Sequence, residues 1–91
     1  MLEGKIKVIN PLGLHARAAA VLVRLAGNFE SKIILARCDN NVIADAKSIL
    51  SVLTLAASKG TQLEINVEGA DEQAAFQAIC EIFADGFGEL I

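Results

Sequence analysis

The segment Gly13-Leu14-His15-Ala16-Arg17 contains the residues best suited to chemistry in this chain. His15 is the only histidine among 91 residues, and a neutral imidazole is a competent nucleophile near pH 7. Arg17 follows two residues later and carries a fork of N–H donors that matches phosphoryl oxygens. The spacing therefore indicates a histidine that accepts a phosphoryl group, with an arginine beside it to hold the added charge.

This segment lies where a loop is expected to meet the start of a helix. Apolar residues at positions 16, 19, 20 and 23 predict a helix over 16–26 that ends at Gly27-Asn28. The first turn of a helix has unpaired N–H groups and a partial positive charge, so it attracts anions. A lone histidine at such a position is also an ordinary helix cap or surface residue, and the spacing leaves both interpretations open.

The remaining elements follow from the same kind of pattern. Four segments have the alternation or the apolar character of strands: 5–9, 32–37, 42–44 and 62–68. Two more have helical spacing: 48–58, and the segment from Asp71-Glu72 to Gly86. Asp39-Asn40-Asn41 predicts a hairpin turn. The order β-α-β-β-α-β-α, with one wet sheet face implied by 62–68, predicts a two-layer α+β sandwich.

Composition excludes several classes of protein. The net charge of −3 argues against non-specific binding to nucleic acid, which needs a basic surface. The longest apolar run extends only from Ala18 to Val23, whereas a membrane-spanning helix needs about 20 such residues. The first residues show no export signal. Cys38 and Cys80 match no metal or redox spacing. We therefore expect a cytoplasmic protein with reduced thiols and no metal.

Residues 10–19, Asn-Pro-Leu-Gly-Leu-His-Ala-Arg-Ala-Ala, closely resemble the active-site loop of HPr, the histidine phosphocarrier of the bacterial phosphotransferase system. The resemblance continues through residues 46–60, 69–72 and 87–89, so it covers essentially the whole chain in order. It implies a single HPr-like domain over residues 1–91. It also implies an open-faced sandwich, in which three helices cover a four-stranded antiparallel sheet of order 1-4-2-3.

The resemblance implies a phosphocarrier rather than an enzyme. His15 would take a phosphoryl group on Nδ1 from Enzyme I, itself charged by phosphoenolpyruvate, and pass it to an Enzyme IIA protein. Arg17 would hold the phosphoryl oxygens, and the backbone N–H groups of Ala16, Arg17 and Ala18 would assist. No cofactor is needed, and the expected state is a cytoplasmic monomer.

One residue departs from the family pattern. HPr proteins usually have proline directly after the arginine, whereas this chain has Ala18. Alanine lacks the fixed φ of proline but adds an N–H group at the phosphoryl-facing end of the helix. The alanine-rich stretch, with residues 56–60 and 87–89, leans towards NPr, the paralogue of the nitrogen branch. The sequence leaves open whether the phosphoryl group serves sugar uptake or a nitrogen-type regulatory relay.

The segment from Lys47 to Leu53 is the second candidate site. In many HPr proteins of Gram-positive bacteria, the serine that matches Ser48 is phosphorylated by an ATP-dependent HPr kinase. Ser48 could also simply cap the second helix, and both roles are compatible. The apolar positions of this segment are too many to lie on one face of a helix, so we expect some of them to be exposed. They include Ile49, Leu50 and Leu53. The resemblance assigns these three residues and Lys47 to docking of Enzyme I and Enzyme IIA.

Two other functions fit parts of the sequence. The chain could be a regulatory binding module that acts through Ile49, Leu50 and Leu53 and through Ser48 phosphorylation, without obligatory turnover of His15. It could also be a small α+β domain whose loop only resembles an anion site. The phosphocarrier interpretation accounts for the most residues, and it is the one we adopt.

Overall fold

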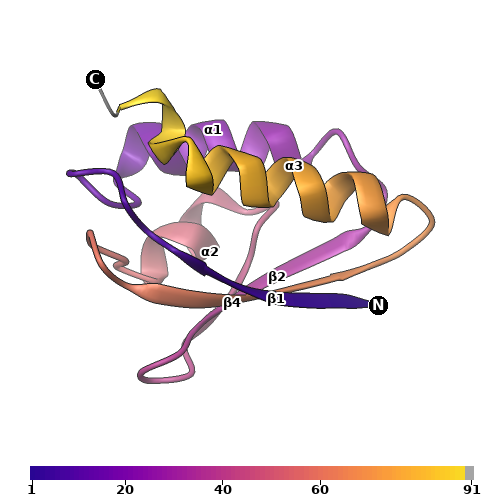
Figure 1. Cartoon of the computed structure of the whole chain (residues 1–91), viewed down its shortest axis with the longest axis horizontal. Helices are drawn as coiled ribbons and strands as arrows, with labels where there is room; N and C mark the ends of the chain where they lie inside the picture. The colour runs from indigo at the N-terminus through magenta and orange to yellow at the C-terminus, as the bar shows by residue number, and fades with distance from the viewer. Residues whose placement is uncertain (90–91) are drawn as a thin grey trace.

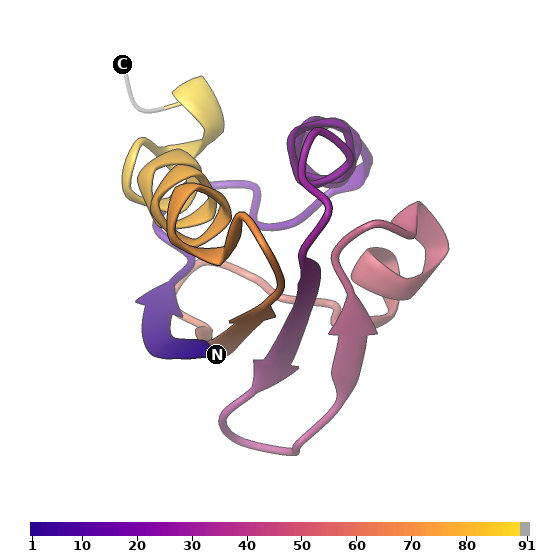
Figure 2. The same ribbon diagram turned by 90° about the vertical axis from the view of Figure 1, so that its right-hand side faces the viewer.

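Four antiparallel strands form one sheet in the order β1-β4-β2-β3. In the computed structural model, which describes residues 1–89, the strands are β1 (Leu2–Lys7), β2 (Lys32–Arg37), β3 (Ile43–Asp45) and β4 (Gln62–Glu68). The helices are α1 (Ala16–Ala26), α2 (Ile49–Thr54) and α3 (Glu72–Ala84). All three cover the same face of the sheet and leave the other face open (Figures 1 and 2). The predicted open-faced sandwich and its strand order are confirmed.

The core lies between the sheet and the helices. Along β4, the side chains of Leu63, Ile65 and Val67 are fully buried, and the residues between them face the open side. Leu22 of α1 and Ile79 of α3 are fully buried in the same hydrophobic cluster. Burying each such aliphatic side chain contributes roughly 1.5–3 kcal/mol, so the alternation in β4 determines which face the helices cover.

Three predicted elements have the observed bounds, and others are shifted. Helix α1 and strands β2 and β4 begin and end where the sequence predicted. The first strand was predicted at residues 5–9 and exists, but its bounds differ: β1 begins at Leu2 and ends at Lys7, paired with β4 along its whole length. Gly4 weakens the strand signal, but the Phe76 ring packs so closely over it that an added Cβ would lie 2.8 Å from the ring. Strand β3 is displaced by one residue, and α3 ends at Ala84.

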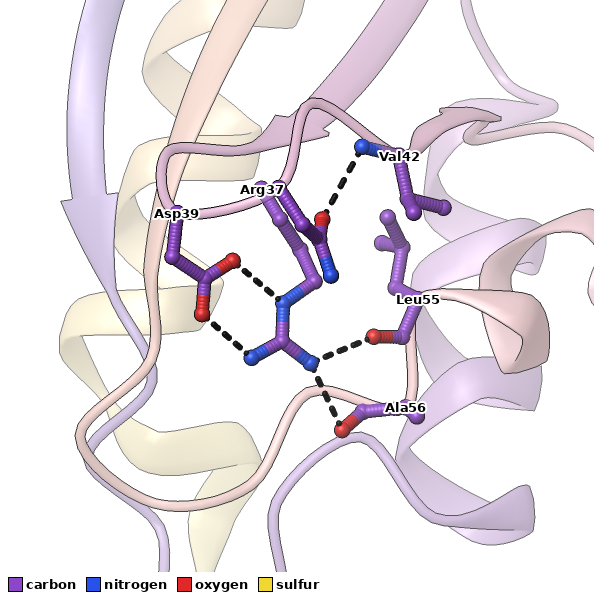
Figure 3. Close-up of polar contacts among 6 residues, drawn as sticks. Arg37, Asp39, Val42, Leu55 and Ala56 are labelled. Atoms are coloured by element: carbon purple, nitrogen blue, oxygen red, sulfur yellow. Dashed lines mark hydrogen bonds and ion pairs between the residues drawn. The ribbon is translucent and has the colours of Figure 1, made fainter.

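The second helix ends earlier than predicted, at Thr54 rather than residue 58. Ala56 has a left-handed backbone with φ of 48°, which stops the helix. Figure 3 shows the group that holds this end: Arg37 Nη1 donates to the carbonyls of Leu55 (2.9 Å) and Ala56 (3.2 Å). The rest of the guanidinium is fixed by Asp39, which accepts from Nε and Nη2. Helical spacing could not reveal this cap, because the arginine comes from β2.

Asp71 links two loops rather than capping its own helix. It is the N-cap residue of α3, as its position in the sequence suggested, but its side chain makes no capping hydrogen bond. Its carboxylate accepts from the backbone N–H groups of Glu30 and Ser31, both at 2.9 Å, and from the Ser31 hydroxyl. The hydroxyl of Ser31 and then the backbone N–H of Glu30 lower the pKa of Asp71 below its usual value. The anionic form therefore stabilises the junction between α1 and β2.

We predict that Asp71→Asn makes the fold less stable at pH 7, and that this deficit shrinks as the pH falls below 4. The folded-state pKa is lower than the unfolded one, so the carboxylate contributes stability above the unfolded pKa and loses it as the pH falls through the folded value. Urea unfolding of both proteins at pH 7 and pH 3 measures this. Asp85→Asn, an exposed acid at the other end of α3, is the matched control. Equal deficits at both pH values would contradict the prediction.

Both cysteines are free. Cys80 packs against the core, and burial raises the pKa of its thiol, while Cys38 is exposed beside the hairpin. Within residues 1–89 no helix is long and apolar enough to cross a bilayer. The same residues contain no group of three or more His, Cys, Asp or Glu side chains that could hold a metal ion.

Candidate functional site

His15 is the N-cap residue of α1, with an extended backbone. The loop before it is held by backbone bonds at two points: Gly13 N–H donates to the Asn10 carbonyl, and Leu14 N–H donates to the Ala57 carbonyl at 2.8 Å. Gly13 has φ of +66°, a conformation that glycine adopts without strain. The short turn therefore delivers His15 to the start of the helix, as the sequence predicted.

The two nitrogens of the His15 ring have different partners. Nδ1 accepts a hydrogen bond from the backbone N–H of Arg17 at 3.3 Å. Nε2 lies 2.5 Å from a carboxylate oxygen of Glu89. An ionised carboxylate only accepts hydrogen bonds, so the proton of the neutral ring lies on Nε2. The lone pair of Nδ1 is left pointing at the helix end.

Glu89 reaches His15 through a sharp change of chain direction after α3. Gly86, Phe87 and Gly88 all have positive φ, and the Phe87 ring packs edge-on against Phe83 with the ring centres 4.9 Å apart. Hydrogen bonds from His15 and then from Asn10 lower the pKa of Glu89. The Glu89 side chain is therefore an anion at neutral pH, and it lies on the side of the ring opposite the helix.

Arg17 and the start of α1 form the other side of the site. The first helical bond runs from Ala19 N–H to the His15 carbonyl, so the N–H groups of residues 16–18 come before the helical hydrogen-bond ladder. Arg17 is exposed and lines a shallow hollow of about 380 Å³ together with Pro11, Leu12, Gly88 and Glu89. The arrangement combines a nucleophilic nitrogen, a helix end and an exposed cation on one surface.

Ser48 and Lys47 are distant from this site. Ser48 is the N-cap of α2, and its hydroxyl accepts from the N–H of Ser51 at 3.3 Å, so its predicted capping role is confirmed. Lys47 donates from Nζ to the carbonyl of Phe29 at 2.7 Å, which places it just beyond the C-terminal end of α1. His15 precedes the other end of that 11-residue helix, which is about 16 Å long. The Lys47 ammonium and His15 therefore lie near opposite ends of α1.

The apolar residues of α2 divide between core and surface. Val52 is fully buried. The exposed fractions of Ile49, Leu50 and Leu53 are 39%, 75% and 37%. The expectation that part of this set is exposed is confirmed, and we call these three residues the α2 patch.

Two residues of the site were not assigned a role from the sequence. Asn10 was considered only as part of the stretch 10–19 that resembles the family's active-site loop, yet its side chain is fully buried and donates to both Gly13 and Glu89. Glu89 lies 74 positions from His15, so no local spacing could pair them. The one available signal was the resemblance of residues 87–89 to the family's closing segment, which marks the position without saying what it contacts.

Comparisons with known proteins agree with this geometry. The model of the PTS-HPr family, described as the PTS HPr component phosphorylation site, matches residues 2–85. Phosphocarrier protein HPr of Cupriavidus necator is 46% identical over 89 residues, covering 98% of each chain. The Xylella fastidiosa HPr is 45% identical, with the same coverage. The crystal structure of HPr-C-His from Thermoanaerobacter tengcongensis covers both chains fully with a TM-score of 0.92 and 36% identity.

Proposed function

The chain belongs to the HPr family of phosphocarriers of the phosphotransferase system, and from that premise we propose that His15 is the residue that carries the phosphoryl group. The observation that supports this most directly is that the two nitrogens of the His15 ring have different hydrogen-bond partners. The Nδ1 lone pair faces the start of α1, while Nε2–H is held by Glu89. Labelling of wild-type and His15→Ala protein with phosphoenolpyruvate and Enzyme I tests the proposal, as set out in the Discussion.

The transfer step follows from these contacts. The Nδ1 lone pair attacks phosphorus of a phosphorylated donor, the P–N bond forms as the bond between phosphorus and the donor atom breaks, and that donor atom keeps the electron pair. The ring gains positive charge, which the anionic Glu89 stabilises through Nε2–H. In the reverse sense, the same charged ring is a good leaving group when the next nucleophile attacks. A carrier of this kind needs no cofactor.

The phosphoryl oxygens need donors on the Nδ1 side. We assign them to the Arg17 guanidinium and to the backbone N–H groups of Ala16, Arg17 and Ala18. The N–H of Arg17 already points at Nδ1, so it is close to any group attached there. A helix N-terminus favours anions, and a guanidinium binds phosphoryl oxygens in a bidentate manner.

We predict that Arg17→Gln slows phosphorylation of His15 about 100-fold, because loss of one preorganised donor to a developing oxyanion has an effect of this order. Arg17→Lys, which retains the charge without the fork, gives an intermediate rate. The measurement is single-turnover transfer from phosphorylated Enzyme I. Arg24→Gln is the matched control, since it removes the same charge from the last turn of α1. Equal slowing by both glutamine variants would leave Arg17 with no specific role.

The proposed protein partners are Enzyme I as donor and Enzyme IIA as acceptor, docking on the α2 patch, with Lys47 at its edge. We predict that Leu50→Glu raises KM for both partners at least about 10-fold and leaves the melting temperature nearly unchanged, because Leu50 is 75% exposed. The control is Ile43→Glu: Ile43 is 64% exposed, but alternation along β3 turns it to the open face. Similar changes in KM for both variants would refute docking at α2.

Three finer assignments stay predictions. One is the nitrogen branch over the sugar branch, which comparison of phosphorylation by a sugar-type and a nitrogen-type Enzyme I would test. Another is modification of Ser48 by an HPr kinase, tested by labelling with ATP, with Ser48→Ala as control. The last is that the protein acts as a monomer, which sedimentation at working concentration would test.

A further inference from the structure

Asn10 occupies an unusual position for an amide side chain. It is fully buried, and its Nδ2 makes two hydrogen bonds, to the Gly13 carbonyl at 2.8 Å and to Glu89 Oε1 at 3.1 Å. Its Oδ1 is also buried and accepts nothing from the residues that the structure describes. An amide in which only the donor is used is poorly explained as a turn former alone. The role of Asn10 must therefore lie in the two hydrogen bonds that its Nδ2 donates.

The contacts of Glu89 indicate what the Asn10 hydrogen bonds do. One carboxylate oxygen faces His15 Nε2 and the other accepts from Asn10, so the carboxylate is held at both ends. The three residues before Glu89 all have positive φ, and the aromatic contact with Phe83 is made by Phe87. Asn10 ties the carboxylate to the loop that carries His15, because its second bond goes to Gly13, two residues before the ring.

We propose that Asn10 is a positioning residue: its buried Nδ2 holds Glu89 against His15 and so keeps Nδ1 as the unprotonated nitrogen that attacks phosphorus. This inference rests on the proposed role of His15 and extends it to a residue that never touches the phosphoryl group. Asn10 acts only through Glu89. Loss of Asn10 lets the carboxylate rotate away from Nε2, and the ring then loses both its fixed orientation and its charge partner.

A double-mutant cycle distinguishes this role from simple support of the turn. We expect Asn10→Ala and Glu89→Ala each to slow single-turnover phosphorylation by about 10-fold, as for loss of one oriented hydrogen bond. The double variant should be no slower than Glu89→Ala alone, because the two residues act in series. If Asn10 only supported Gly13, the two losses would multiply to about 100-fold, and the proposal would be overturned.

A spectroscopic measurement tests the same point without any transfer. In wild-type protein the Nε2–H proton of His15, bonded to Glu89, should give a downfield ¹H resonance on ¹⁵N-labelled histidine. Asn10→Ala should move that resonance upfield, whereas an unchanged resonance would refute the proposal even if transfer slowed. Asn10→Asp, which has the same size but no donor, should behave as Asn10→Ala. If Asn10→Asp fails to fold, Asn10→Ala, which buries no charge, supplies the comparison. If wild-type protein took up no phosphoryl label, the proposed role of His15 would fail. The Nε2–H resonance of His15 would still show whether Asn10 positions Glu89.

Discussion

We expect replacement of His15 with alanine to abolish uptake of a phosphoryl group from phosphoenolpyruvate in the presence of Enzyme I. The loss should be complete because His15 is the only histidine in the chain, so no second imidazole can substitute. In wild-type protein the label should be labile in acid and stable in base, as expected for a P–N bond to imidazole. The measurement is incorporation of ³²P, followed by treatment of the labelled protein at both extremes of pH.

Ser48→Ala is the matched control for this experiment. It removes the other candidate acceptor, the N-cap residue of a different helix, α2, and should take up label from Enzyme I as wild type does. Equal labelling of His15→Ala and wild type, or an acid-stable label in wild type, would contradict the assignment. ³¹P and ¹⁵N spectra of the labelled protein should show phosphorus on Nδ1, because Nε2 is engaged by Glu89.

We expect replacement of Gly13 with alanine both to destabilise the fold and to slow phosphorylation. The backbone at Gly13 has φ of +66°, and an added Cβ would meet the carbonyl oxygen of Ala57 and lie 2.8 Å from Cα of Ser58. Left-handed strain of roughly 1–2 kcal/mol adds to the displacement of backbone, which typically costs 1–3 kcal/mol, so a total of about 3 kcal/mol is expected. This is a large part of the roughly 5–15 kcal/mol that holds a small domain together.

Gly60→Ala separates the two causes. Gly60 also has positive φ, at +93°, but an added Cβ there would have no atom within 4 Å. This variant should therefore lose only the strain component, about 1–2 kcal/mol, and keep a normal rate of phosphorylation. Urea unfolding and single-turnover transfer measure the two effects. Equal destabilisation by both substitutions would show that the contact between Gly13 and the 57–58 backbone is unimportant.

Local patterns in the sequence were sufficient to predict much of this fold. The alternation in residues 62–68 and the helical spacing in 16–26 are strong, and both elements have the predicted bounds. The prediction failed where a distant residue decides the outcome. Helix α2 ends early because Arg37, the last residue of strand β2, donates hydrogen bonds to the carbonyls of Leu55 and Ala56.

The same limit applies to the candidate site. His15 and Arg17 are two positions apart, so their cooperation is visible in the sequence. Asn10 and Glu89 are 79 positions apart, and only folding brings them together. Residue type gave no guide either, since an asparagine before a proline is an ordinary turn signal. Only the burial of its side chain shows that it has another role.

If His15 carries the phosphoryl group as proposed, its N-cap position couples the energy of the phosphoryl bond to the stability of helix α1. In the free protein Nδ1 caps the helix by accepting from Arg17 N–H, and that cap is lost when Nδ1 forms a bond to phosphorus. The phosphoryl oxygens then supply new, charged acceptors for the same end of the helix. By thermodynamic reciprocity, whatever the helix gains from the phosphate lowers the group-transfer potential by an equal amount. The cap that is lost is a 3.3 Å bond to a neutral ring, and the helix end that receives the phosphate is exposed at Ala16 and Arg17. At such an end an anion contributes only about 0.3–1 kcal/mol, so the difference is small, as a relay between two proteins requires.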